Sequence, residues 1–326
     1  MSARATGLSP QEAVERALAA ARCDDCVVIA EETSDANLRW AGNTLTTNGV
    51  SRSRQLTVIA IDRRAGGAAA AGVVSRAGVR PDQIEEVVRE AEHAAAEGTP
   101  AEDAARLPGP EQSWSPGPAG DESDQVAGPG NAESFGMLGP EERRWDSPPD
   151  RTEIGLLRDF AAGLGETLRG AAAAGRKLYG FAEHGLVSTF LGTSAGLRLR
   201  YDQPTGRIEL NAKSADLTRS AWTGAATRNF TDVDIAGLDA GLAERLSWAE
   251  RSVSLPPGRY ETLLPPTAVS DLLVYLYWSA GAKDAADGRT VFSQAGAAPG
   301  SASGCPRCLS RCQATRGRPG SAARPS

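Results

Sequence analysis

Five cysteines and two histidines are the side chains in this chain best suited to bind a transition metal. Cys23 and Cys26 form a Cys-x-x-Cys pair, and Cys305, Cys308 and Cys312 lie near the end of the sequence. Zinc ligands must converge from structured loops, whereas the last three lie in a stretch with no folding signal. We therefore expect reduced thiols, as in a cytosolic protein, and no metal site in this chain.

The histidines, His93 and His184, are far apart in the sequence and have no ligand spacing. His184 falls in a predicted strand, where a histidine that is hydrogen-bonded within the sheet is more common than a functional one. We keep His184 as a candidate functional residue, with this structural role as its alternative.

Local patterns predict the elements of the first hundred residues. Ser9 as N-cap and Pro10 in the first turn indicate a helix to about Arg22. The expected strands are residues 26–30, 37–41, 56–61 and 68–74, with a turn at Gly42-Asn43, a hairpin loop at 62–67 and a helix at 81–97. This order is typical of an α+β protein with antiparallel sheets and packed helices, not of a doubly wound fold.

The second half follows a stretch at about 107–149 that is rich in Pro, Gly, Ser and acidic residues and has no period, which indicates a disordered linker or insert. The elements expected after it are a helix at 154–170, strands at 179–191, 196–201, 207–213 and 221–227 with a turn at 203–206, a helix at 238–249, a strand at 260–264 and a helix at 265–280. The last helix is apolar on most sides, which predicts burial in a core or under a partner.

The length of 326 residues is enough for two ordinary domains. We expect an N-terminal α+β domain at 1–104, a linker or insert at 105–150, a middle α+β domain at 151–293 and a tail at 294–326. The tail has five arginines and no Asp, Glu or Lys, which predicts disorder and suggests a frameshift.

Charge and hydropathy exclude some classes of function. Thirty-five basic and 41 acidic side chains give a net charge of −6, and no basic stripe precedes the tail, so a nucleic-acid partner is not expected. Residues 1–10 lack the apolar core of a signal peptide, and no apolar run is long enough to span a bilayer. We expect a cytoplasmic protein without a membrane partner.

Three stretches resemble a known family: residues 37–43, residues 180–213, and residues 255–293. In these the chain is similar to the TldD/PmbA metallopeptidases, or modulators of DNA gyrase, and most similar to their PmbA/TldE-type subunit. The resemblance implies a two-domain protein that pairs with a TldD-type subunit, in which a His-Glu-x-x-x-His helix binds zinc. It also implies a β-rich C-terminal domain, which looks truncated after Ser293.

The zinc motif of the family has no counterpart in this chain. Between the Leu-Pro-Pro and Val-Phe-Ser landmarks, the motif positions correspond to Val274, Tyr275 and Ser279. Valine has no lone pair, and neutral hydroxyls are weak zinc ligands, so the resemblance implies no catalytic or metal-binding residue here and zinc only in the partner. Tyr275, Tyr277 and Trp278 suit an interface anchor, with ordinary core packing as the alternative.

The function implied by the resemblance is that of a non-catalytic subunit in a cytoplasmic zinc metalloprotease that processes small unfolded peptides. Such a subunit would complete the fold of its partner, shape the substrate chamber, or hold the peptide as an added strand. Two alternatives remain open. One is an autonomous metallopeptidase with an unrecognised site, and the other is a regulatory binding module, such as a partner for a gyrase or a toxin–antitoxin system.

Overall fold

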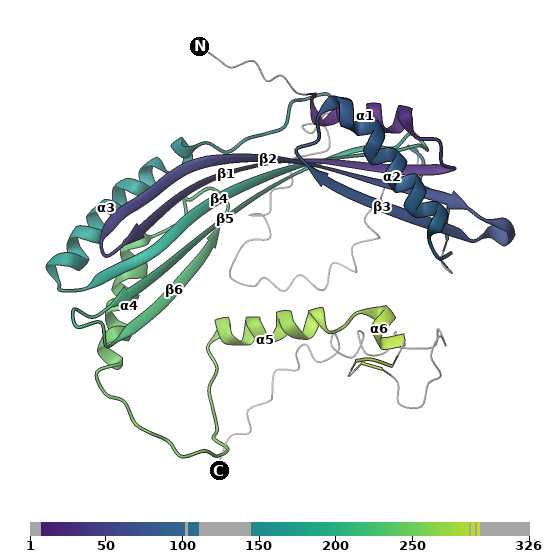
Figure 1. Cartoon of the computed structure of the whole chain (residues 1–326). Helices are drawn as coiled ribbons and strands as arrows, with labels where there is room; N and C mark the ends of the chain where they lie inside the picture. The colour runs from purple at the N-terminus through teal and green to yellow at the C-terminus, as the bar shows by residue number, and fades with distance from the viewer. Residues whose placement is uncertain (1–7, 102–103, 111–144, 287, 291, 294–326) are drawn as a thin grey trace, which may run out of the picture. The chain divides into compact units, whose positions relative to one another are not determined.

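The computed structural model describes residues 8–101, 104–110, 145–286, 288–290 and 292–293. The chain divides into two compact units between Ser252 and Val253. The described part of the first unit is a six-stranded antiparallel sheet with four α-helices, and the strand order is β3-β2-β1-β4-β5-β6 (Figure 1). The second unit contributes two further helices.

The α+β class with an antiparallel sheet and packed helices is thus confirmed. The strands are β1 Asp25–Ala41, β2 Thr44–Arg63, β3 Ala69–Ala77, β4 Lys177–Thr193, β5 Arg198–Lys213 and β6 Ser220–Thr227. The helices of the first unit are α1 Pro10–Ala20, α2 Ile84–Glu97, α3 Arg158–Ala173 and α4 Ile235–Trp248, and those of the second are α5 Pro266–Trp278 and α6 Ala282–Ala286. Short 3-10 turns are η1 Ala65–Gly67, η2 Pro81–Gln83 and η5 Ile154–Leu157.

The central strand β1 joins the two halves of the first unit. It pairs with β2 along one edge and with β4 along the other, from Val27 opposite Thr193 to Trp40 opposite Gly180. We expected separate domains at 1–104 and 151–293, but strands from both stretches form one sheet. Most of the predicted linker at 105–150 and the tail at 294–326 lie outside the described residues.

Two predicted breaks in strands are absent from the structure. β1 is a single strand, because residues 31–36 keep the alternation between its two faces. β5 likewise runs through the expected turn at 203–206. Pro204 is tolerated there because β6 pairs with β5 only from Gly206 onward, so this part of β5 has a neighbouring strand on one side only.

One face of the sheet carries all four helices of the unit. Every second residue of β1 from Cys26 to Trp40 is buried, so both apolar clusters lie on the same face. At one end of the sheet, Val14 of α1 and Val88 of α2 pack in a cluster with Phe190 of β4. Helices α3 and α4 cover the other end (Figure 1). The opposite face stays partly exposed.

Several local predictions are confirmed. Ser9 and Glu12 form a capping box at the start of α1, and Gly42 and Asn43 adopt positive φ values of 58° and 67° in the turn between β1 and β2. The predicted strand at 260–264 is wrong, since this segment has no regular structure. None of the helices in the described ranges is both long enough and apolar enough to cross a membrane.

Candidate functional site

The first candidate surface is α5, the apolar helix of the second unit. None of its side chains is buried, and Tyr275, Tyr277 and Trp278 are 71%, 81% and 75% exposed. Pro265 and Pro266 start the helix, and no side chain caps its N-terminus. Three large aromatic side chains therefore lie on four consecutive positions of an exposed helix.

The three motif positions lie on α5 or at its end. Val274 and Tyr275 are exposed. The Ser279 hydroxyl donates its proton to the Tyr275 carbonyl oxygen at 2.9 Å, at the C-terminal end of the helix. In the part of the chain that the structure describes, no three His, Cys, Asp or Glu side chains come close enough to share a metal ion.

The second candidate is a belt of buried polar side chains between the two apolar clusters on the covered face of the sheet. We call it the polar belt, and its members are Glu32, Ser34, Thr152, His184, Ser188, Arg200 and Asp202. Sequence reasoning identified only His184 among them. The polar belt uses the same alternating positions of β1, β4 and β5 that elsewhere bury apolar residues, so periodicity alone did not distinguish it.

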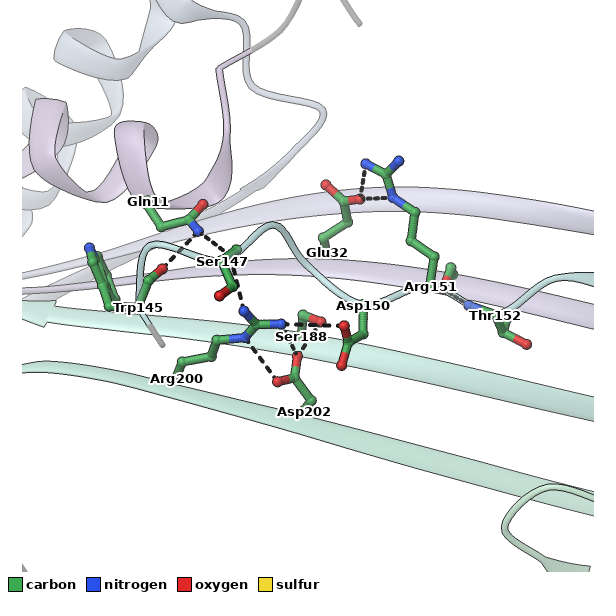
Figure 2. A network of polar contacts seen from close by, with 11 residues as sticks. Gln11, Glu32, Trp145, Ser147, Asp150, Arg151, Thr152, Ser188, Arg200 and Asp202 are labelled. Carbon is green, nitrogen blue, oxygen red and sulfur yellow. Dashed lines mark hydrogen bonds and ion pairs between the residues drawn. The ribbon is translucent and has the colours of Figure 1, made fainter. Parts of the chain in front are cut away.

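A strap formed by residues 145–153 crosses the polar belt (Figure 2). The Trp145 ring packs edge-on against Phe190, with ring centroids 5.6 Å apart. The Ser147 carbonyl oxygen accepts hydrogen bonds from Gln11 at 2.7 Å and from Arg200 at 3.0 Å. The end of the predicted linker therefore has specific partners, which its Pro- and Ser-rich composition did not indicate.

Ion pairs neutralise the buried carboxylates of the polar belt. Glu32 pairs with Arg54 at 2.7 Å and with Arg151 of the strap at 3.0 Å. Asp202 pairs with Arg200 at 2.9 Å and also accepts a hydrogen bond from Ser188. These pairings connect the sheet to the strap, and each buried carboxylate has a cationic partner that compensates its burial.

His184 links three parts of the first unit. Its Nε2 lies 2.8 Å from the Arg228 carbonyl oxygen, which can only accept, so Nε2 donates and Nδ1 accepts from the Thr152 hydroxyl at 2.7 Å. Burial lowers the pKa of His184, which favours the neutral ring. Both ring nitrogens are engaged, so neither offers a lone pair to a metal. His93 is exposed on α2, 3.4 Å from Glu97.

Comparison with known proteins addresses the fold. No family model matches the chain, and no curated protein matches its sequence. Among solved structures, TldE from Thermococcus kodakarensis superimposes with a TM-score of 0.52 at 13% identity, over 74% of this chain and 47% of that one. A proposed modulator of a DNA gyrase from Thermotoga maritima gives 0.51 at 14% identity, over 76% and 50%.

A second proposed modulator of DNA gyrase, from Bacteroides thetaiotaomicron, gives a TM-score of 0.56 at 14% identity, over 85% of this chain and 57% of that one. The matched region is thus about half the length of these proteins. At such identities the likeness concerns the fold. The resemblance to the TldD/PmbA family is therefore confirmed at this level: the chain has the fold of the corresponding part of TldE and of these modulators of DNA gyrase.

Proposed function

We propose that this chain is the non-catalytic subunit of a two-part zinc peptidase that acts on small unfolded peptides. Two features of α5 carry the proposal: Val274, Tyr275 and Ser279 stand at the positions that correspond to the zinc motif, and Tyr275, Tyr277 and Trp278 form an exposed aromatic surface. The fold shared with TldE supports it and suggests a TldD-type partner. In this proposal the partner supplies the zinc and the catalytic glutamate.

The side chains of α5 fit an interface better than a solvent-facing helix. Tyrosine and tryptophan are enriched among residues that dominate binding energy, because they bury much apolar area and keep one polar group for a hydrogen bond. On a helix, Tyr275 and Trp278 lie three positions apart on one side, and Leu272 adds an exposed apolar side chain one turn earlier. A partner that covers this side would remove all three from water.

The sheet offers a place for an extended peptide. β6 is the last strand in the sheet order, and its sequence Ser-Ala-Trp-Thr-Gly-Ala-Ala-Thr contains no proline and no charge that would oppose another strand. We propose that an unfolded substrate adds to this edge by main-chain hydrogen bonds. Such bonds do not depend on the side chains of the peptide, so they suit peptides of varied sequence.

The two thiols at Cys23 and Cys26 suit a reducing compartment, and we propose the cytoplasm.

The direct test is pairing with a TldD-type homologue, measured by co-purification and size-exclusion chromatography. The chain should form a complex, and Tyr275→Ala with Trp278→Ala should weaken it by a factor of about 30 or more, as expected for loss of about 2 kcal/mol or more. Trp248→Ala on α4 is the matched control, because Trp248 is also exposed, at 65%, but lies in the first unit.

Two other outcomes would contradict the proposal. Peptide cleavage by the isolated chain would indicate an autonomous peptidase. Tight binding to a gyrase or a toxin–antitoxin protein, together with no binding to the peptidase homologue, would indicate a regulatory module.

A further inference from the structure

We propose that Cys23 and Cys26 form a thiol–disulfide exchange site, which small-molecule disulfides such as oxidised glutathione convert into an intramolecular disulfide. The site lies in the first unit: Cys23 is in the loop after α1, and Cys26 is the second residue of β1. It is independent of the proposed peptidase role.

The first cysteine is held in place by α2. The Glu92 carboxylate accepts hydrogen bonds from the backbone N–H groups of Arg22 and of Cys23, the latter at 3.1 Å. Arg89 donates to the Ala20 carbonyl oxygen at 2.6 Å and also pairs with Glu92. The backbone leading into Cys23 is therefore fixed by two charged side chains of α2.

The second cysteine is held in place by β4 and its following turn. The Cys26 N–H donates to the Ser194 hydroxyl at 2.9 Å, and the Cys26 carbonyl oxygen accepts from the Ser194 N–H at 2.8 Å. The Cys26 side chain is buried in the apolar cluster of α1 and α2, whereas Cys23 is partly exposed. The Cys23 side chain is thus the more accessible of the two.

The two cysteines influence each other's ionisation. The Cys23 thiol donates to the Asp25 carbonyl oxygen at 3.1 Å. Hydrogen bonding with Cys26, aided by the Ile61 backbone, lowers the pKa of Cys23 to about 7, while the same interaction and burial raise the pKa of Cys26. A partly exposed thiolate beside a shielded thiol is the arrangement of an attacking and a resolving cysteine.

Charged groups around the pair come from three elements. Glu92 on α2 opposes ionisation of both thiols. Asp24 and Asp25 in the loop and at the start of β1 are engaged by Arg63 of β2, through its N–H at 2.7 Å and its guanidinium at 2.7 Å. The stabilisation of the Cys23 thiolate therefore comes from hydrogen bonds, since no cation is among its causes.

The exchange proceeds in two displacements. The Cys23 thiolate attacks one sulfur of the small disulfide, which forms a mixed disulfide and releases one thiolate. The released thiolate takes the proton of Cys26, and the Cys26 thiolate then attacks the Cys23 sulfur and releases the second small thiolate. In sum, two protein thiols lose two electrons and one small disulfide is reduced to two thiols.

The test uses the full chain with Cys305, Cys308 and Cys312 replaced by serine, so that the remaining two cysteines account for all thiol chemistry that is measured. The folded protein is equilibrated with mixtures of reduced and oxidised glutathione, quenched with acid, alkylated and mapped by mass spectrometry. We expect both thiols to disappear together as one Cys23–Cys26 disulfide. The equilibrium should favour this disulfide at least about tenfold more in the folded chain than in denaturant, because the fold holds the backbone of both cysteines in place.

Single substitutions separate the two roles. Cys26→Ser should stop the reaction at one glutathione on Cys23, whereas Cys23→Ser should leave Cys26 unmodified while the chain stays folded. The proposal is overturned if both thiols of the folded chain survive excess oxidised glutathione, or if both carry glutathione. It is also overturned if the disulfide forms no more readily in the folded chain than in denaturant. These readouts use the chain with both cysteines present, so they hold even if a single variant misfolds.

Discussion

Arg200 and Asp202, two residues apart on β5, form an ion pair of 2.9 Å whose side chains are only 3% and 6% exposed. Arg200 also lies over the Phe190 ring, 5.2 Å from its centroid, and donates to Ser147 of the strap. This pair therefore connects the apolar cluster at one end of the sheet with the strap that crosses the polar belt (Figure 2).

Asp202→Ala should destabilise the first unit by about 3 kcal/mol, because it leaves a buried guanidinium without its closest carboxylate. The free energy of unfolding, measured by chemical denaturation, checks this value. Asp82→Ala is the matched control, since Asp82 also pairs with an arginine, Arg80, but on the surface. The account of the polar belt is contradicted if both variants unfold at the same denaturant concentration as the parent chain.

The stability of the first unit should decrease as the pH falls below about 6.5. Burial lowers the pKa of His184 in the folded state, so the unfolded chain binds a proton at a higher pH than the folded one. The contribution of neutral His184 to the free energy of unfolding is complete above the pKa of this histidine in the unfolded chain. It is lost as the pH falls through its pKa in the folded chain. The free energy of unfolding is measured by chemical denaturation at a series of pH values from about 7.5 to about 5. These limits lie roughly one unit or more on either side of the ordinary histidine pKa of about 6.5.

His184→Gln should flatten this pH dependence, and His93→Gln should leave it unchanged. The two are a matched pair, because the sequence has no other histidine and His93 is exposed. An equal pH dependence in the parent chain and in the His184 variant would show that His184 is not its source.

Gly72→Ala should cost about 2 kcal/mol or more, because a Cβ at this position of β3 would collide with the α2 backbone at Ala91 and Ala95. Gly49→Ala in β2 is the control, since a Cβ there meets no atom within 4 Å. Thermal and chemical denaturation of both variants measure the difference. Similar stability of the two would mean that α2 does not pack closely against β3.

Alkylation of Cys23 should be half-maximal near pH 7, in keeping with its lowered pKa. Above this pH the thiolate predominates and the rate levels off, whereas in the denatured chain the midpoint should move to about 8.5, the ordinary thiol value. Rates from iodoacetamide labelling at a series of pH values measure both midpoints. If the folded and denatured chains share one midpoint, the hydrogen bond from Cys26 does not stabilise the thiolate.

Local signals in the sequence predicted local structure. The N-cap at Ser9, the turn at Gly42-Asn43 and the helical spacing of α2 each depend on neighbouring residues, and the structure confirms them. The exposure of α5 was not predicted from its sequence, because an apolar helix has the same pattern whether its cover is part of the chain or not.

The polar belt could not be predicted because its partners are distant in the sequence. Arg151 and Glu32 are 119 residues apart, and Thr152 and Ser34 are 118 apart. Strands that contain Glu32, Ser34 or Pro204 look interrupted when the strap and the neighbouring strands are not known. The pairing of β1 with β4 is equally non-local, which is why one sheet was expected to be two domains.

The most direct test of the proposed role is the location of zinc in the reconstituted pair. This chain and a TldD-type homologue are purified separately and together, and metal content and cleavage of an unfolded peptide are measured with and without a chelator. The account predicts zinc in the homologue alone, no cleavage by this chain by itself, and chelator-sensitive cleavage by the complex. Stoichiometric zinc in the isolated chain, with cleavage that a chelator abolishes, would contradict it.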